Sequence, residues 1–365
     1  MFPKLIELPF INFTLWTYGP MLVAGFLAAV YLLRRLAHRV GQNPDYVTNV
    51  ALYTLISGVI GARIFYVVHH FSQFRGDPWW SVFAVWQGGL EFIGGLILAV
   101  IVIVVYLLRH RLSVRLYLDM LAIGLMLGLS FGRIGCFLRG CCFGKPTDVP
   151  WAVRFPYNSP AYDSQVRPNM LRNRPQPQLD LPAEYFGYTG ENGQTWLCVD
   201  EAHKFSANLK PAELLTDGQR YEVTKGRYRC LPVHPAQLYS SLNAVLLCGL
   251  LFFYWRRFGL TWPGCTFSLM FVLYGFTRFW LEFVRDDNPF ESGWWTISDK
   301  LTVSQNVGIY LFVLGLVLII IFAKTRPFGA GTGRRISKPK KTKNRTLTTS
   351  PNQQRLAAHP CKRSN

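Results

Sequence analysis

Long apolar runs separated by polar segments are the main pattern of the chain. Seven runs with few charges are about long enough to cross a hydrocarbon core of about 30 Å as helices. They cover residues 18–33, 47–68, 89–108, 117–137, 235–254, 262–284 and 306–323. The pattern therefore predicts an all-α polytopic membrane protein with about seven transmembrane helices.

Basic residues are concentrated in every second connection between these runs. Lys and Arg follow the first, third, fifth and seventh runs, whereas the only long connection, 138–234, falls on the other side. Basic loops remain in the cytoplasm. We therefore expect the N-terminus outside and the C-terminus inside. The first run continues directly into Arg34-Arg35, as a retained span does, so no cleavable signal peptide is expected.

Composition changes along the chain predict its parts. Only 16% of residues are charged, against about a quarter in soluble domains. Residues 145–233 are rich in Pro, Asn, Gln and charge, and 324–365 hold 12 Lys or Arg and no Asp or Glu. We predict a membrane bundle of spans 1–4 (1–144), a small irregular extracytoplasmic head (145–233), spans 5–7 (234–323) and a basic disordered cytoplasmic tail (324–365). The tail follows an apolar span and is interpreted as a segment near anionic headgroups, with no nucleic acid partner.

Several ionisable residues lie inside or at the edges of the predicted spans, where they are costly and usually functional. Arg278 and Glu282 are four residues apart and are expected to pair on one helical face. Arg63 and Arg133 could lock the bundle through helix-end carbonyls. Three arginines at similar depth, however, favour a phosphate-bearing ligand, because Arg donates bidentate hydrogen bonds to phosphate. The others in this set are Glu91, Asp119, His234 and Arg285.

Short motifs occur in the order seen in prolipoprotein diacylglyceryl transferases, and from about Tyr18 to Phe290, without most of the head, the chain resembles this family. The motifs are Tyr18-Gly19, Gly61-Ala62-Arg63-Ile64, Trp86-Gln87-Gly88-Gly89-Leu90 with Gly94-Gly95, Gly132-Arg133-Ile134-Gly135-Cys136-Phe137 with Gly140 and Gly144, Pro150-Trp151-Ala152-Val153, His234-Pro235-Ala236-Gln237-Leu238-Tyr239, and Tyr274-Gly275-Phe276-Thr277-Arg278-Phe279 with Glu282. Outside this resemblance, the glycines are equally typical of close helix packing.

The resemblance implies a transferase of the bacterial inner (plasma) membrane with its active site toward the periplasm. Phosphatidylglycerol would donate its diacylglyceryl group to the lipobox cysteine of preprolipoprotein signal peptides. Arg133 and Arg278 would hold the phosphate and headgroup, Tyr18 and Tyr274 would line the site, and Glu282 would orient Arg278. No metal or soluble cofactor is implied. The further expected substrate contacts are Arg63, Gly88, Gly89, Gly94, Gly95 and Gly144.

One departure from the family's motifs concerns the base that would deprotonate the acceptor thiol. Ile93 stands where the family has a histidine, and isoleucine cannot accept a proton. Glu91 and His234 are the expected substitutes, because a carboxylate in an apolar mouth can gain a raised pKa and act as a base.

Cysteines form a second departure. Cys136, Arg139 and Cys141 stand where the family's signature has two amides and a carboxylate, and Cys142 follows directly. The three cysteines form a tight group in the sequence. They could form a disulfide, supply a nucleophile or make half of a metal site; a structural role is favoured and zinc is the weakest option, because only His234 is an obvious extra ligand. Cys198 and Cys230 could form a disulfide.

Two alternative functions follow from the cysteines and from the charged spans. One is a divergent paralogue that uses a lipid-binding bundle with reactive thiols for redox chemistry or acyl transfer. The other is a non-catalytic lipid-binding protein or transporter, although the inverted repeats of many transporters are not visible.

Overall fold

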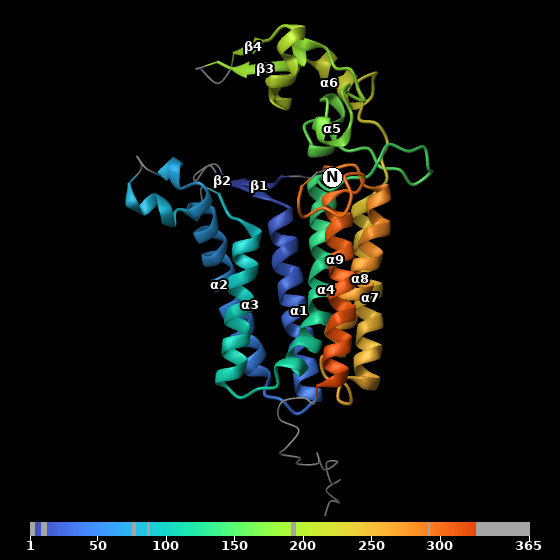
Figure 1. Cartoon of the computed structure of the whole chain (residues 1–365). Helices are drawn as coiled ribbons and strands as arrows, with labels where there is room; N and C mark the ends of the chain where they lie inside the picture. Colours follow the sequence, from blue (N-terminus) through green and yellow to red (C-terminus); the bar gives the residue numbers. More distant parts are fainter. Residues whose placement is uncertain are drawn as a thin grey trace, which may run out of the picture. The chain divides into compact units, whose positions relative to one another are not determined.

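The computed structural model describes residues 4–8, 13–74, 78–85, 88–190, 195–290 and 293–325, all within one compact unit. Seven helices are long and apolar enough to span a membrane, which confirms the predicted fold class (Figure 1). They are α1 (Tyr18–Arg39), α2 (Pro44–His69), α3 (Phe92–Arg109), α4 (Val114–Arg139), α7 (Ala236–Phe258), α8 (Cys265–Leu281) and α9 (Val303–Lys324). Trp86, Gln87, Cys361 and nearly all of the predicted tail lie outside the described residues.

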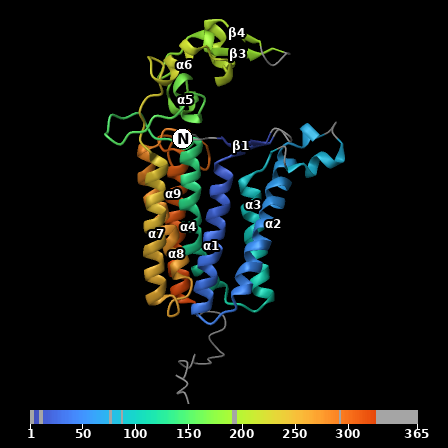
Figure 2. The ribbon, with the colours of Figure 1, turned by 180° about the vertical axis from the view of Figure 1, so that it is seen from behind.

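The helices pack mainly as neighbouring pairs. α2 packs on α3, α1 on α4, α4 on α7, and α8 on α9, an arrangement visible from both sides in Figures 1 and 2. Glycines allow the closest approaches: a Cβ atom on Gly61 would lie 2.5 Å from the carbonyl oxygen of Gly94, and one on Gly275 would lie 2.5 Å from that of Gly308. Without a strong hydrophobic force between helices in lipid, such close contact supplies much of the packing energy.

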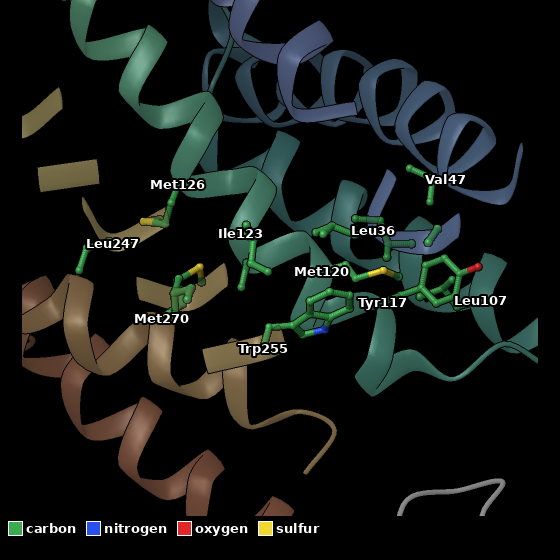
Figure 3. Close-up of a cluster of buried hydrophobic side chains, with 14 residues drawn as sticks. Leu36, Val47, Leu107, Tyr117, Met120, Ile123, Met126, Leu247, Trp255 and Met270 are labelled. Carbon is green, nitrogen blue, oxygen red and sulfur yellow. The ribbon is translucent and has the colours of Figure 1, made fainter. Parts of the chain in front are cut away.

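One end of the bundle is closed by apolar side chains. We call it the inner end, and the opposite end, which carries residues 140–235, the outer end. Leu36 of α1, Leu107 of α3, Met120 of α4 and Trp255 of α7 are all nearly inaccessible and belong to one cluster (Figure 3). Helices that are far apart in sequence are therefore joined at the inner end by a dry core.

The buried carboxylate of Asp119 has a structural partner at this inner end. Its Oδ2 accepts a hydrogen bond from the Gly264 N–H at 2.7 Å, and its Oδ1 accepts one from the Phe267 N–H at 2.8 Å. These groups belong to the first turn of α8, where unpaired N–H groups and the helix dipole favour a negative charge. Asp119 is thus a cap for a neighbouring helix.

The predicted head is small, as expected, but it has more regular structure than its composition indicated. A three-stranded antiparallel sheet of order β4-β3-β5 contains β3 (Phe186–Thr189), β4 (Trp196–Cys198) and β5 (Asn208–Leu209). Tyr162 and Tyr185 are nearly inaccessible in the core beside it. The apolar residues of this core are far apart in a mostly polar segment. A search for regular hydrophobic spacing over a few turns or strands therefore does not detect them.

Shorter elements complete the described chain. They are the paired strands β1 (Lys4–Leu8) and β2 (Phe13–Trp16), the helices α5 (Pro160–Val166) and α6 (Asp217–Thr224), and short 3₁₀ helices at Phe71–Phe74, Trp79–Phe83, Met170–Arg172, Ala183–Tyr185, Glu201–Ser206, Ala212–Leu214 and Glu282–Val284.

Candidate active site

The chain reverses direction sharply at the outer end of α4. Gly140 has φ +82°, and Cys142 has φ +59°, which is uncommon for a residue with a side chain. The Cys141 N–H donates to the Cys136 carbonyl at 3.1 Å, and the Gly140 N–H donates to the Phe137 carbonyl at 3.2 Å. This pair of bonds is a Schellman motif. It returns the chain toward the last turn of α4.

The next residues are clamped between two other segments. The Gly144 N–H donates to the His234 carbonyl at 3.1 Å, and the Lys145 N–H donates to the Val284 carbonyl at 2.8 Å. A Cβ atom on Gly144 would lie 2.5 Å from the His234 oxygen, so a side chain there would force the segments apart. The clamp brings the end of α4 beside the start of α7 and the end of α8. For Gly144 the structure therefore shows a packing role, and its predicted substrate contact stays a prediction.

Buried ion pairs surround this clamp. Arg278 Nη2 lies 3.1 Å from Glu282 Oε2 and donates to Ser304 Oγ at 2.6 Å, so the predicted pairing of Arg278 with Glu282 is confirmed. Arg285 donates to both carboxylate oxygens of Asp287, at 2.9 and 2.7 Å. Glu282 and Arg285 are only 2% and 3% exposed, so these charges are oriented by one another and shielded from water.

Arg133 differs from its neighbours because it makes no hydrogen bond or ion pair within the described part of the chain. It is only partly exposed, and it lies close enough to Arg278, Tyr18 and Cys142 for their charges to interact. The Tyr18 ring packs near the backbone of Gly135, one turn before the end of α4. A guanidinium with unused donors beside a second cation has the chemistry to accept an anion with several oxygens.

The buried arginines and thiols change the pKa values of two nearby groups outside the spans, Asp287 and Cys142. Burial raises the pKa of Asp287, although its hydrogen bonds from Arg285 act in the opposite direction. Hydrogen bonds from Cys136 and Cys141, together with Arg285 and Arg133, lower the pKa of the Cys142 thiol. Arg285 therefore favours the charged forms of both Asp287 and Cys142.

The structure thus brings together five of the predicted site residues: Tyr18, Arg133, Tyr274, Arg278 and Glu282. Tyr274 lies one turn before Arg278 and interacts with it electrostatically. The sequence did not single out Asp287 or Ser304, which orient Arg285 and Arg278. The sequence offered a clue only for Asp287, which is a carboxylate two residues after Arg285 at the edge of a predicted span; it offered none for Ser304.

Arg63 belongs to a different environment. It is 7% exposed and donates to four backbone carbonyls, those of Ser81, Val82, Gly88 and Gly89, at 2.7 to 3.0 Å. Gly88 and Gly89 have φ of +89° and +71°. These contacts are those of the bundle-locking interpretation, and no donor group of Arg63 is left without a partner.

Gly94 and Gly95 also have structural contacts. A Cβ atom on Gly94 would lie 2.5 Å from the Gly61 carbonyl oxygen, and one on Gly95 would lie 2.7 Å from that of Gly58. Both glycines therefore face α2, and their predicted contact with substrate stays a prediction, as it does for Gly88 and Gly89.

The two predicted bases have partners other than the arginines. Glu91 is held at 2.7 to 2.9 Å by Nδ1 of His69, a residue that the sequence reasoning missed. The position of His69 in the sequence could have indicated this pairing, because His69 ends α2 and Glu91 directly precedes α3 in the same helical hairpin. His234 Nδ1 lies 3.3 Å from the Tyr239 hydroxyl. Among the described residues, no hydrogen bond or ion pair joins Glu91 or His234 to the arginine cluster.

The cysteines of the head are separate thiols. Cys198 is exposed on β4, whereas Cys230 is buried and its pKa is raised to about 11 because of burial. The disulfide considered for this pair is therefore not formed. Cys136, Cys141 and Cys142 are also free, and their sulfur atoms all lie within 4.8 Å of one another.

Seven helices that are long and apolar enough to span a membrane, with a cluster of buried arginines at one end, define a multi-pass membrane protein. The sequence profile of prolipoprotein diacylglyceryl transferases matches residues 3–321. The chain belongs to this family, and the predicted resemblance and enzyme class, a membrane transferase, are confirmed.

Individual relatives extend over most of the chain. Three of them are named phosphatidylglycerol–prolipoprotein diacylglyceryl transferase. The Clostridium tetani protein is 26% identical over 88% of this chain and 98% of its own length. The Bdellovibrio bacteriovorus protein is 27% identical over 86% and 90%, and the Gloeobacter violaceus protein is 25% identical over 84% and 88%.

Proposed function

We propose that this chain transfers the diacylglyceryl group of phosphatidylglycerol to the lipobox cysteine thiol of preprolipoproteins and releases glycerol 1-phosphate. Family membership supports the reaction, and the observation that carries it to particular residues is the unpartnered guanidinium of Arg133 beside Arg278. The acceptor would be the signal peptide of a preprolipoprotein.

The chemistry places the largest demand on the leaving group. The thiolate sulfur attacks the glycerol carbon, and the carbon–oxygen bond to phosphate breaks, so negative charge develops on the phosphate oxygen. Arg133 would donate to that oxygen from a site with little water. Arg278, fixed by Glu282 and Ser304, would hold the rest of the headgroup without needing to reorganise.

Other predicted residues take supporting roles. Tyr18 and Tyr274 would line the lipid site, and Gly144 would keep the clamp narrow. Arg63, with Gly88, Gly89, Gly94 and Gly95, would shape the α2–α3 hairpin against which the lipid lies, through the observed carbonyl and helix contacts. Glu91, oriented by His69, and His234 remain the proposed proton acceptors.

Orientation follows from the basic loops. We place the chain in the bacterial inner membrane with the N-terminus outside, the cationic cluster and head on the periplasmic side, and the basic tail in the cytoplasm. This arrangement would present the site to the leaflet in which exported preprolipoproteins arrive.

Complementation tests this proposal. The chain is expressed in cells depleted of their own transferase, and lipoprotein maturation is followed by gel shift. We expect rescue by the unmodified chain and by Arg256→Ala, a control at an exposed arginine of the inner end of α7. We expect no rescue by Arg133→Ala or Arg278→Ala. Absence of rescue by inserted, folded, unmodified chain would reject the proposed reaction.

A further inference from the structure

The most unusual feature outside the roles assigned so far is the group of three thiols at the outer end of α4. The Schellman turn after α4 returns Cys141 to Cys136, and the left-handed conformation of Cys142 turns its side chain to the same point. All three sulfur atoms lie within 4.8 Å of one another. Strained backbone of this kind persists where the surrounding structure holds it and is concentrated at functional sites.

This spacing fits a thiolate-bound metal ion. Sulfur atoms bound tetrahedrally to zinc at about 2.3 Å are separated by about 3.8 Å, so small side-chain rotations would suffice. Across the described residues, no His, Asp, Glu or fourth Cys atom joins the group. Structural zinc sites have four protein ligands, whereas catalytic sites have three and an open position. The missing fourth ligand, which made zinc unattractive from sequence spacing, therefore indicates an open site.

We propose that Cys136, Cys141 and Cys142 hold one zinc ion whose fourth position binds the thiol of the acceptor cysteine as a thiolate. This inference rests on the proposed function, because it assigns the acceptor's binding point in that reaction. Metal-bound thiols are deprotonated. The ion would deprotonate the acceptor thiol near Arg133 and would replace Glu91 and His234 in that role, since neither makes a hydrogen bond or ion pair with Arg133, Arg278 or Arg285 within the described residues.

The step balances without a redox partner. The acceptor S–H proton passes to water when the sulfur binds zinc. The sulfur electron pair forms the new sulfur–carbon bond, and the carbon–oxygen bond electrons leave with the phosphate, which Arg133 holds. Three cysteine thiolates on zinc carry one net negative charge, and the neighbouring guanidiniums of Arg133 and Arg285 compensate it.

Zinc suits this role better than copper(I). Both metals bind thiolates, but three thiolates satisfy trigonal copper(I) and leave no position for a substrate. A disulfide between two of the cysteines would use two sulfur atoms and would also remove the binding point. Both arrangements are therefore competing outcomes of the test.

The first arm of the test measures metal binding in the full chain, purified in detergent and supplied with zinc alone. We expect about one zinc per chain, with three sulfur ligands at about 2.3 Å and one lighter ligand by X-ray absorption. Adding a lipobox peptide should give a fourth sulfur, and the same peptide with serine in place of its cysteine should not. No stable zinc, bound copper(I), a disulfide within the group, or an unchanged sulfur count would each overturn the inference.

The variant controls use the cysteines of the chain itself. Replacing the three thiols by Cys136→Ser, Cys141→Ser and Cys142→Ser together should abolish zinc binding, whereas Cys198→Ser, at an exposed thiol of the head, should retain it. Because the triple variant could misfold, zinc is also removed from the unmodified chain with a chelator and then restored. Zinc retention by the folded triple variant would overturn the assignment.

The second arm separates this inference from the proposed function. Removal of zinc should lower phosphatidylglycerol-dependent lipidation of the peptide by about 100-fold or more, the usual scale for losing proton removal from a nucleophile, and zinc should restore it. Full lipidation by the zinc-free chain would overturn the zinc site and leave the proposed function intact. Arg133→Ala should bind zinc and the peptide sulfur normally while failing to transfer lipid. If the unmodified chain gains the fourth sulfur but never transfers lipid, the proposed reaction fails and the thiol-binding zinc site stands.

Discussion

The outer ends of the α2–α3 hairpin and of the α4–α8 pair each contain an arginine, Arg63 and Arg133 respectively, but only Arg63 has hydrogen-bond partners among the described residues. Arg63 and Arg133 both follow small residues near the outer ends of spans. Arg63 donates to four carbonyls, whereas Arg133 has no hydrogen bond or ion pair with the described residues. An arginine inside a membrane is therefore diagnostic of ligand binding only when the structure leaves its donors unused.

The backbone explains the difference. Ser81, Val82, Gly88 and Gly89 turn their carbonyls toward Arg63, and Gly88 and Gly89 do so with positive φ. At the end of α4, the Schellman motif pairs the carbonyls with backbone N–H groups instead. None of these carbonyls accepts from Arg133, so its guanidinium is left for a ligand.

Substitution of the free arginine should have the largest effect on catalysis. Arg133→Ala is expected to reduce lipid transfer by about 10²–10³-fold, the scale of losing one donor to a developing oxyanion. The unfolding temperature should change little, because no hydrogen bond or ion pair with the described residues is lost. Transfer to a lipobox peptide and thermal unfolding in detergent measure the two quantities. A large fall in unfolding temperature with little change in rate would make Arg133 structural.

Substitution of Arg63 should lower stability strongly and the transfer rate only weakly, the reverse of the effect expected for Arg133. Arg63→Ala leaves four carbonyls without their donor and is expected to lower the free energy of unfolding by about 3 kcal/mol or more, because a buried acceptor left unsatisfied costs about 1–3 kcal/mol. The rate per folded molecule should fall much less than for Arg133→Ala. A stable Arg63→Ala protein with a rate as low as that of Arg133→Ala would place Arg63 in the ligand site.

Glycine-to-alanine substitutions should have the smallest effects on stability. They compare how closely the helices pack in the α2–α3 hairpin and around α4. In the α2–α3 hairpin, Gly61→Ala places a methyl group 2.5 Å from the Gly94 oxygen and should cost about 1–3 kcal/mol. Gly58→Ala is the matched control in α2, since its methyl group would lie 4.0 Å from the Gly95 oxygen. On the α4 side, Gly132→Ala meets no atom within 4 Å and should be neutral. Equal unfolding temperatures for the three variants would contradict the close α2–α3 contact.

Local features of the sequence were sufficient to predict the architecture of seven membrane-spanning helices. Each span is recognisable because a helix in lipid must satisfy its own backbone hydrogen bonds and expose apolar side chains over a set length. The pairing of Arg278 with Glu282 was also predictable, because residues four apart share a helical face. The motifs and their order were sufficient to indicate the family, which the profile match confirmed.

Partners distant in sequence could be identified only in the tertiary structure. Asp119 caps a helix that begins at Cys265, His69 meets Glu91 across a hairpin, and the head core gathers separated aromatic residues. The sequence also did not distinguish Arg63 from Arg133, or show that three sulfur atoms converge. Hydropathy and helical spacing act along the chain and can be read locally. Whether a charge or thiol is already satisfied depends on which backbone groups folding brings to it from elsewhere.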